Sequence, residues 1–231
     1  MSVWAVLVAA GRGERLGEDR PKAFARLGEL PLLAEPLRRL DESSWVDEIV
    51  VVAPSEWEEP AILLAEEIGA SKVSACVSGG ATRTESVRAG VAEVPEDAAV
   101  IVVHDAARPL VEPTAVAACI AAARADGAAL LATPVADTVK RTAGERVTAT
   151  VPRADLWLAQ TPQVFRADLL RRAHAQAASS GIVDTDDAAL VERLGVPVRV
   201  VPSSHLNRKI TTSDDLAWAE AIVAGFPHLR L

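Results

Sequence analysis

The sequence predicts an α/β fold in which a mostly parallel sheet carries helices on both faces. Short apolar runs alternate with longer helical patterns along most of the chain, and such alternation is typical of parallel strands joined by crossover helices. Half of the 231 residues are hydrophobic, which is enough to build a large core. The alternation breaks at Asp137, where polar and apolar residues alternate over 137–153 and predict a β-hairpin. We therefore expect one Rossmann-like domain, 1–231, with a hairpin arm inserted at 136–158.

The expected strands and helices follow one another in a regular order. Apolar runs predict strands at 3–10, 47–54, 73–77, 99–103, 128–135 and 198–201. Helical patterns occupy 32–40, 58–68, 87–94, 113–126, 169–178, 184–194 and 214–223. Local chemistry marks several helix ends: Pro113 suits a first helical position, Gly127 follows a helix end, and Ser213 suits an N-cap.

The loop after the first strand has the composition of a phosphate-binding site. It reads AAGRGERLGEDRPK over 9–22. Glycines let backbone N–H groups close around an anion, because no Cβ stands in the way. Arg12, Arg15, Arg20 and Lys22 add positive charge to the same loop. We therefore predict that it binds phosphate groups.

Two common phosphate-binding loops do not match this pattern. The Walker loop ends in Gly-Lys-Ser/Thr, which is missing here, and the dinucleotide motif G-x-G-x-x-G needs a glycine where Leu16 stands. A dehydrogenase is also disfavoured because the second expected strand ends in Val-Ala-Pro at 52–54, without an acidic residue. The spacing G-x-G-x-R-x-G followed by P-K resembles instead the signature loop of the nucleotidyltransferases, which join an alcohol phosphate to a nucleotide.

Other residues with useful chemistry also follow expected strands. Gly79 and Gly80 come after the strand at 73–77, and Asp105 comes after the strand at 99–103. Parallel strands share one edge for their carboxyl ends, and ligands of such sheets bind beyond that edge. We therefore expect these residues and the first loop to line one site.

Seven segments together go beyond the general class. They read AAGRGERLG…PK, GGATRTESV, VHDAARP, PVADTVKR, QTPQVF, DTDDA and NRKITTSDDL, in that order. In this order they resemble the 2-C-methyl-D-erythritol 4-phosphate cytidylyltransferase family of the non-mevalonate isoprenoid pathway, from Val3 to about Ala221. The resemblance implies a reaction in which CTP and methylerythritol 4-phosphate give a CDP-alcohol and pyrophosphate. It also implies Mg²⁺, or another divalent cation, as cofactor.

The implied reaction needs charge neutralisation more than proton transfer. A phosphate monoester has a second pKa of about 6 and is already ionised at pH 7, so no general base is required. Cations must instead reduce the repulsion between this dianion and a triphosphate.

The resemblance assigns roles to individual residues. The catalytic cations are Arg15 and Lys22. The nucleotide contacts are Ala9, Ala10, Gly11, Gly13, Gly79, Gly80, Ser86, Asp105 and Ala106. The contacts to the alcohol phosphate are Asp105, Arg108, Thr138, Arg153, Thr161, Thr185 and Lys209. Asp105 is also the candidate Mg²⁺ ligand, whereas His104 is expected to be structural. The sequence departs from many relatives at Ala81, where they carry an acidic residue, so the details of cytosine recognition are open.

The hairpin arm predicts a partner. A bare hairpin is marginally stable in water, so we expect it to pack against a second copy of the chain. The resemblance implies the same homodimer, in which the arm residues Thr138 and Arg153 complete the site of the neighbouring subunit.

Charge and cysteine content limit the other partners. The net charge of −8 argues against general binding of nucleic acid or an anionic membrane, and no apolar run reaches the roughly 18 residues of a membrane span. Cys76 and Cys119 lie in apolar stretches and are expected to be buried free thiols, which fits a reducing compartment. We therefore expect a cytoplasmic protein.

Two alternatives remain at this point. Ribitol 5-phosphate cytidylyltransferases use the same chemistry on another alcohol, although Ala107 favours methylerythritol. A non-catalytic nucleotide-binding module on the same fold would need no such combination of Arg15, Lys22 and Lys209.

Overall fold

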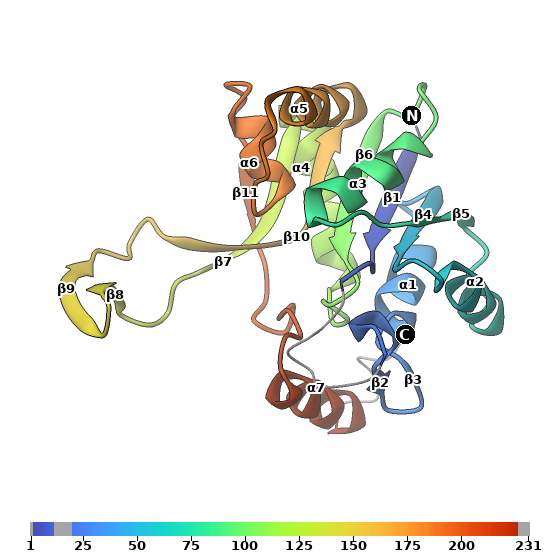
Figure 1. Ribbon diagram of the computed structural model, residues 1–231, viewed down its shortest axis with the longest axis horizontal. Helices are drawn as coiled ribbons and strands as arrows, with labels where there is room; N and C mark the ends of the chain where they lie inside the picture. The colour runs from blue at the N-terminus through green and yellow to red at the C-terminus, as the bar shows by residue number, and fades with distance from the viewer. Residues whose placement is uncertain (1, 12–19, 226–231) are drawn as a thin grey trace.

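A seven-stranded sheet forms the centre of the computed structural model, which describes residues 2–11 and 20–225. The strand order is β11-β7-β10-β6-β1-β4-β5, and every pairing is parallel except the two made by β10. The predicted mostly parallel sheet is therefore confirmed (Figure 1). Its strands are β1 (Val3–Val8), β4 (Glu48–Ala53), β5 (Val73–Ser78), β6 (Val100–Asp105), β7 (Ala128–Pro134), β10 (Trp157–Arg166) and β11 (Arg199–Pro202).

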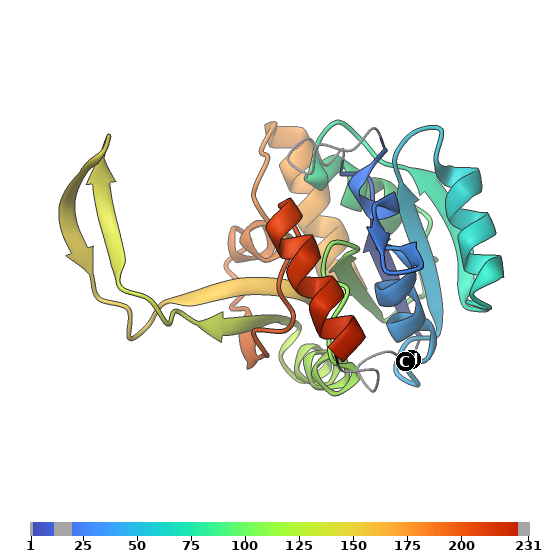
Figure 2. The same ribbon diagram turned by 90° about the horizontal axis from the view of Figure 1, so that it is seen from below.

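Helices cover both faces of this sheet (Figures 1 and 2). One buried cluster joins the sheet to α1 (Ala34–Asp41), α2 (Glu58–Glu67) and α4 (Pro113–Asp126). A second cluster joins the opposite face to α3 (Arg83–Ala92), α5 (Ala167–Ser180) and α6 (Asp187–Glu192). The helix α6 is shorter than the predicted 184–194, because the Asp186 side chain caps its first turn by accepting from the Ala189 N–H at 3.0 Å.

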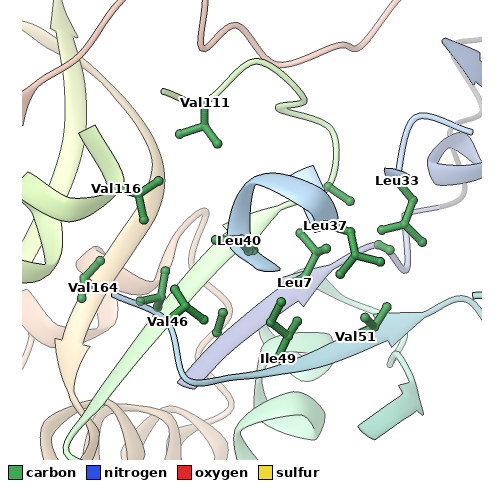
Figure 3. Packing of buried hydrophobic residues seen from close by; sticks show 14 of the residues in the cluster. Leu7, Leu33, Leu37, Leu40, Val46, Ile49, Val51, Val111, Val116 and Val164 are labelled. Atoms are coloured by element: carbon green, nitrogen blue, oxygen red, sulfur yellow. The ribbon is translucent and has the colours of Figure 1, made fainter. Parts of the chain in front are cut away.

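The core consists mainly of Val, Leu, Ile and Ala, as the composition predicts. Figure 3 shows Leu37 and Leu40 of α1 lying over Leu7 of β1 and Ile49 of β4. All four side chains are fully buried. Each buried leucine or isoleucine of this kind contributes about 1.5–3 kcal/mol, so the central strands are firmly anchored.

A smaller layer lies beyond the carboxyl ends of the parallel strands (Figure 1). It contains α7 (Ser213–Gly225), a short hairpin of β2 (Arg26–Leu27) and β3 (Leu30–Pro31), and the 3-10 helix η2 (Lys22–Phe24). A third buried cluster joins β2 to α7 through Leu27, Ala219 and Val223, whereas Ala23 and Phe24 of η2 pack in the first cluster. The sequence predicts α7 but carries no clear pattern for β2, β3 or η2.

The strand β10 was not predicted either. It runs antiparallel between β6 and β7 in the middle of the sheet. Proline is unusual in a central strand because it cannot donate to the ladder, but Pro162 lies where the pairing register with β7 shifts, between Ala159 and Gln163. The ladder is already interrupted there, so the proline is tolerated.

The predicted hairpin is present as β8 (Val139–Ala143) and β9 (Arg146–Val151). It forms a separate two-stranded sheet that extends far from the body, between β7 and β10 (Figure 2). Most of its side chains are exposed, including Val147 at 61%. We call residues 136–158 the arm.

Two further observations concern the described residues. None of their helices is both long and apolar enough to cross a membrane. Both cysteines are free thiols, but only Cys119 is buried; Cys76 is half-buried because β5 is an edge strand of the sheet.

Candidate active site

A cavity of about 570 Å³ lies at the carboxyl ends of β1 and β6, as the alternation predicts. This volume lies within the roughly 300–1,000 Å³ of typical small-molecule sites. Its lining combines the start of the first loop, the glycine turn after β5, the N-terminus of α3 and the segment before α7. The lining residues are Val8, Ala9, Ala10, Gly11, Lys22, Ala23, Gly80, Ala81, Thr82, Arg83, Ser86, Asp105, Ala106, Ala107, Lys209 and Thr211.

The turn at Gly79 and Gly80 has no room for side chains. A Cβ on Gly79 would overlap the side chain of Ala10 and approach Ser86 Oγ at 2.8 Å, and one on Gly80 would overlap Glu85. The Gly80 N–H donates to Ser86 Oγ at 3.1 Å. Glycine is therefore required where the turn packs against the first loop.

The helix α3 begins at the cavity with a capping box. Thr82 accepts from the Glu85 N–H through its side chain at 3.1 Å, and the Glu85 carboxylate accepts from the Thr82 N–H at 3.1 Å. This is the T-x-x-E pattern of a helix N-terminus. The capping box fixes the direction in which Arg83, the first helical residue, enters the site.

Asp105, the last residue of β6, holds two cations. Its Oδ1 accepts from Arg83 Nε at 3.1 Å, and its Oδ2 accepts from Lys209 Nζ at 2.6 Å. Burial alone would raise the pKa of this carboxyl, but Arg83 and Lys209 outweigh burial and hold it far below its usual value. Asp105 is therefore ionised throughout the physiological range.

A neutral histidine fixes the backbone behind Asp105. Burial lowers the pKa of His104 to about 4, so its Nε2–H donates to the Arg108 carbonyl at 3.2 Å and its Nδ1 accepts from Thr161 at 3.2 Å. Thr161 Oγ1 in turn accepts from the Asp105 N–H at 3.0 Å. His104 is thus structural, as predicted, and Thr161 lies behind Asp105, outside the cavity lining.

Arg108 is buried and joins β6 to the segment that carries Lys209. It donates from Nη1 to the Asn207 carbonyl at 2.7 Å and from Nη2 to the Ala159 carbonyl at 3.4 Å. The Ile210 N–H donates to the Ala107 carbonyl at 2.8 Å in the same region. Through these contacts, Arg108 fixes the segment that carries Lys209. The predicted contact of Arg108 with the alcohol phosphate stays a prediction.

The other predicted site residues, taken together with those above that line the cavity, fall into four groups. Most line the cavity: Ala9, Ala10, Gly11, Lys22, Gly80, Ser86, Asp105, Ala106 and Lys209. Gly79 lies directly behind the lining, against Ala10 and Ser86. The exposed residues Thr138, Arg153 and Thr185 lie elsewhere, the first two in the arm and the third before α6. Arg15 and Gly13 fall outside the described residues.

Arg83 and Asp187 have no role predicted from the sequence, although they belong to the motifs GGATRTESV and DTDDA. Arg83 lines the cavity and pairs with Asp105 and, at 2.7 Å, with the buried Asp187. One signal in the sequence could have pointed to them: each motif contains a charged residue to which no partner was assigned. Their pairing over a separation of 104 residues required the fold.

The donor set suits a magnesium ion that is carried mainly by the substrate. Among the residues that the structure describes, Asp105 is the only carboxylate of the cavity lining, and none of them form a group of three potential metal ligands. Mg²⁺ commonly binds through one or two carboxylates together with substrate phosphates and water. Asp105 fits that arrangement, whereas a resident metal held by protein alone does not fit these residues.

The fold and this cavity define a class of protein, and comparisons with known proteins identify the family. A glycine turn beyond a parallel sheet and several cations around one carboxylate fit the nucleotidyltransferase class that the first loop predicts. Residues 3–225 match the sequence model of the 2-C-methyl-D-erythritol 4-phosphate cytidylyltransferase family. The chain belongs to this family and is therefore a cytidylyltransferase.

Individual relatives agree with this assignment. The chain is 46% identical to a 2-C-methyl-D-erythritol 4-phosphate cytidylyltransferase from Pelotomaculum thermopropionicum, covering 96% of this chain and 94% of the relative. It is 47% identical to one from Nocardia farcinica, covering 96% and 94%. The crystal structure of the Thermus thermophilus enzyme of that name superposes with a TM-score of 0.81 at 36% identity, covering 97% of this chain and all of that one.

Proposed function

We propose that this protein transfers a cytidylyl group from CTP to 2-C-methyl-D-erythritol 4-phosphate. The products are 4-diphosphocytidyl-2-C-methyl-D-erythritol and pyrophosphate. The observation that carries the proposal is one cavity lined by the first loop, the Gly79–Gly80 turn, Lys22, Lys209 and Asp105, in a chain of this family. Ribitol 5-phosphate is the alternative substrate, and the experiment below includes it for comparison.

The proposed step is a direct displacement at phosphorus. An ionised phosphate oxygen of the alcohol substrate forms a bond to the α-phosphorus of CTP. The bond from that phosphorus to the bridging oxygen breaks, and its electron pair leaves with pyrophosphate. No proton needs to move at pH 7, because the attacking phosphate has a second pKa of about 6.

The cations of the cavity supply the stabilisation. Lys22 lines the cavity beside Ala9–Gly11, and we assign to it and to Arg15 the neutralisation of charge on the α-phosphate as it becomes five-coordinate. The backbone at Ala9–Gly11 and Gly79–Gly80 approaches the nucleotide, with Ser86 holding the turn. Lys209 and Asp105 face the alcohol phosphate and its hydroxyl groups. Preorganised charges of this kind are effective because they need no rearrangement during the reaction.

Magnesium belongs to the same proposal. When bound, Mg²⁺ or another divalent cation would neutralise the triphosphate, and Asp105 is the residue of this chain that would hold it. Asp105 could then exchange a contact with Arg83 or Lys209 for the metal. Omitting divalent cations should abolish transfer.

We also propose a homodimer formed through the arm. A two-stranded hairpin without a covering layer is marginal in water, and the arm of a single chain is exposed over nearly its whole length. A second copy would cover it and bring Thr138 and Arg153 to the neighbouring site, where the arginine can bind phosphate bidentately. The cytoplasmic location is supported by two free cysteines, since reducing compartments keep thiols unpaired.

Pyrophosphate release tests the function. CTP and Mg²⁺ are supplied with methylerythritol 4-phosphate or ribitol 5-phosphate in parallel. We expect release with the first alcohol, and a loss of about 10²-fold or more in kcat for Lys22→Ala. Lys72→Ala is the matched control, because Lys72 precedes β5 at the opposite end of the strands and donates to the Ser43 carbonyl; its kinetics should match the wild type.

The two alternatives give different results. Release with ribitol 5-phosphate alone would change the substrate and keep the mechanism. Binding of CTP without release from either alcohol would make the protein a non-catalytic nucleotide-binding module.

A further inference from the structure

The two neighbouring acids of the DTDDA motif, 184–188, have different partners. Asp186 caps α6 and accepts from Gln163 Nε2 at 2.8 Å. Asp187 has a side chain only 1% exposed, and it accepts from Arg83 Nη1 at 2.7 Å and from His174 Nε2 at 3.0 Å. Only Asp187 therefore contacts a residue of the cavity lining.

Asp187 is the inner end of a line of alternating charges. Asp187 pairs with Arg83, Arg83 pairs with Asp105 at 3.1 Å, and Asp105 pairs with Lys209 at 2.6 Å. We call these four residues the ionic chain. Its negative end is buried between α5 and α6, whereas its positive end, Lys209, is 39% exposed at the cavity. The ionic chain thus presents the Lys209 cation to the ligand, while its two negative and two positive charges balance.

The backbone of Asp187 is fixed as firmly as its side chain. The N–H groups of Asp187 and Ala188 both donate to Gln163 Oε1 at 3.0 Å. Burial alone would raise the pKa of Asp187, but Arg83 and His174 lower it further than burial raises it. The carboxylate is therefore charged and immobile, which suits it to hold another charged group in place.

Arg83 binds two carboxylates, and this determines which oxygen of Asp105 each cation contacts. An arginine with one carboxylate partner tends to bind both of its oxygens. Here Asp187 takes Nη1, so Arg83 reaches Asp105 Oδ1 through Nε alone and leaves Oδ2 to Lys209. Without Asp187, Arg83 would be free to rotate toward Asp105 and compete with Lys209 for Oδ2.

We propose that Asp187 is a positioning residue for cytidylyl transfer: it holds Arg83 from the interior, and so fixes Asp105 and keeps Lys209 at the cavity. This inference rests on the proposed function. Because Asp187 contacts neither the glycine turn nor the described residues of the first loop, 9–11 and 20–22, its loss should affect turnover more than CTP binding. Misplacement of reacting groups by about 1 Å costs on the order of 10²-fold, and loss of a supporting contact commonly costs about 10- to 100-fold.

The experiment compares Asp187→Asn with Asp186→Asn in the full-length protein. Both variants lose one negative charge at the start of α6, but only the first loses the contact with Arg83. We measure kcat, KM for CTP and melting temperature. Asp187→Asn should lower kcat by about 10- to 100-fold with a KM for CTP within about twofold of wild type. Asp186→Asn keeps a capping oxygen for the Ala189 N–H, because asparagine caps helices about as well as aspartate, but it loses the acceptor of Gln163 Nε2. Its melting temperature should therefore fall by at most a few degrees, while both kinetic constants stay within about twofold.

A wild-type kcat for Asp187→Asn would overturn the proposal. So would equal kinetic losses in the two variants, because they would reflect damage to α6. If the wild-type protein itself transfers no cytidylyl group, the proposed function fails, and this inference fails with it. If wild type is active and only the contrast between the variants is missing, the proposed function stands and the positioning role alone is refuted.

A second variant tests the route through Arg83. Arg83→Lys keeps the charge but cannot reach Asp105 and Asp187 together, so it should show the same fall in kcat. Adding Asp187→Asn to Arg83→Lys should then cost less than about a further twofold, because coupled residues are non-additive. Fully multiplicative losses would show that Asp187 acts independently of Arg83, and would contradict the proposal.

Discussion

Acid should destabilise this protein through His104 well before its carboxylates titrate. His104 is fully buried, and burial lowers its pKa to about 4, against about 6.5 in an unfolded chain. Because the folded pKa is depressed, the unfolded state binds more protons between these two values. The free energy of unfolding therefore has its full value above about pH 6.5 and falls as the pH drops toward 4.

The size of this effect follows from the shift. A difference of about 2.5 pKa units corresponds to about 3 kcal/mol in full, at about 1.4 kcal/mol per unit. Between pH 7 and 4.5 the loss is about 2 kcal/mol, since most of the titration of the unfolded imidazole lies in that window. Asp105 adds little there, because its depressed pKa matters only near and below about 4, where an unfolded aspartate protonates.

Urea unfolding at a fixed protein concentration measures this loss. The comparison is wild type against His104→Gln, which removes the titrating group and leaves an amide to face Thr161 and Arg108. The free energy of unfolding of the wild type should fall by about 2 kcal/mol more than that of the variant between pH 7 and 4.5. Parallel curves for the two proteins would refute a neutral, buried His104. The other histidines are common to both proteins and cancel in the difference.

Three further predictions concern the cavity and the arm. Gly79→Ala should weaken CTP binding by about tenfold or more, because its Cβ overlaps Ala10; calorimetry should show no such change for Gly225→Ala, whose Cβ meets open space. Thr161→Val should lower the free energy of unfolding by about 1–3 kcal/mol in denaturant titrations, because it leaves the Asp105 N–H buried without its acceptor. Replacing 138–152 by a short Gly-Ser linker should give a monomer in sedimentation that binds CTP but transfers nothing, and a dimer would contradict the proposed role of the arm.

The sequence was informative wherever one local property decides the structure. Continuous apolar runs predicted β1, β4, β6 and β7, because parallel strands in this fold are buried on both faces. The positions of Gly11, Gly80 and Asp105 after strands then placed them at one edge, where the cavity is found. The hairpin was predicted from the alternation of polar and apolar residues and from the turn signal around Gly144, whose φ in the structure is +56°.

The sequence was uninformative where a residue's role depends on distant partners. Gln160, Thr161 and Gln163 are polar residues beside a proline, so they carry no strand signal, yet all three are buried in β10. Their burial is possible because each finds a hydrogen-bond partner from another element. Likewise, the pairing of Lys209 with Asp105 joins positions 104 residues apart, which no local pattern predicts.

The polar residues of this antiparallel strand also hold parts of the site in place. Gln160 Oε1 accepts from Asn207 Nδ2 at 2.9 Å and supports the segment of Lys209. Thr161 holds the backbone of Asp105, and Gln163 holds the backbone of Asp187. One strand therefore positions three separate parts of the site.

The same strand is the continuation of the arm, because the chain passes from β9 into β10. The supports of Asp105, Asp187 and Lys209 therefore lie on the strand that directly follows the arm in the sequence. A parallel strand could not serve in this way, since it would return to the sheet only through a crossover. The proposed dimer and the proposed active site consequently share one structural element, the segment that runs from the arm into β10.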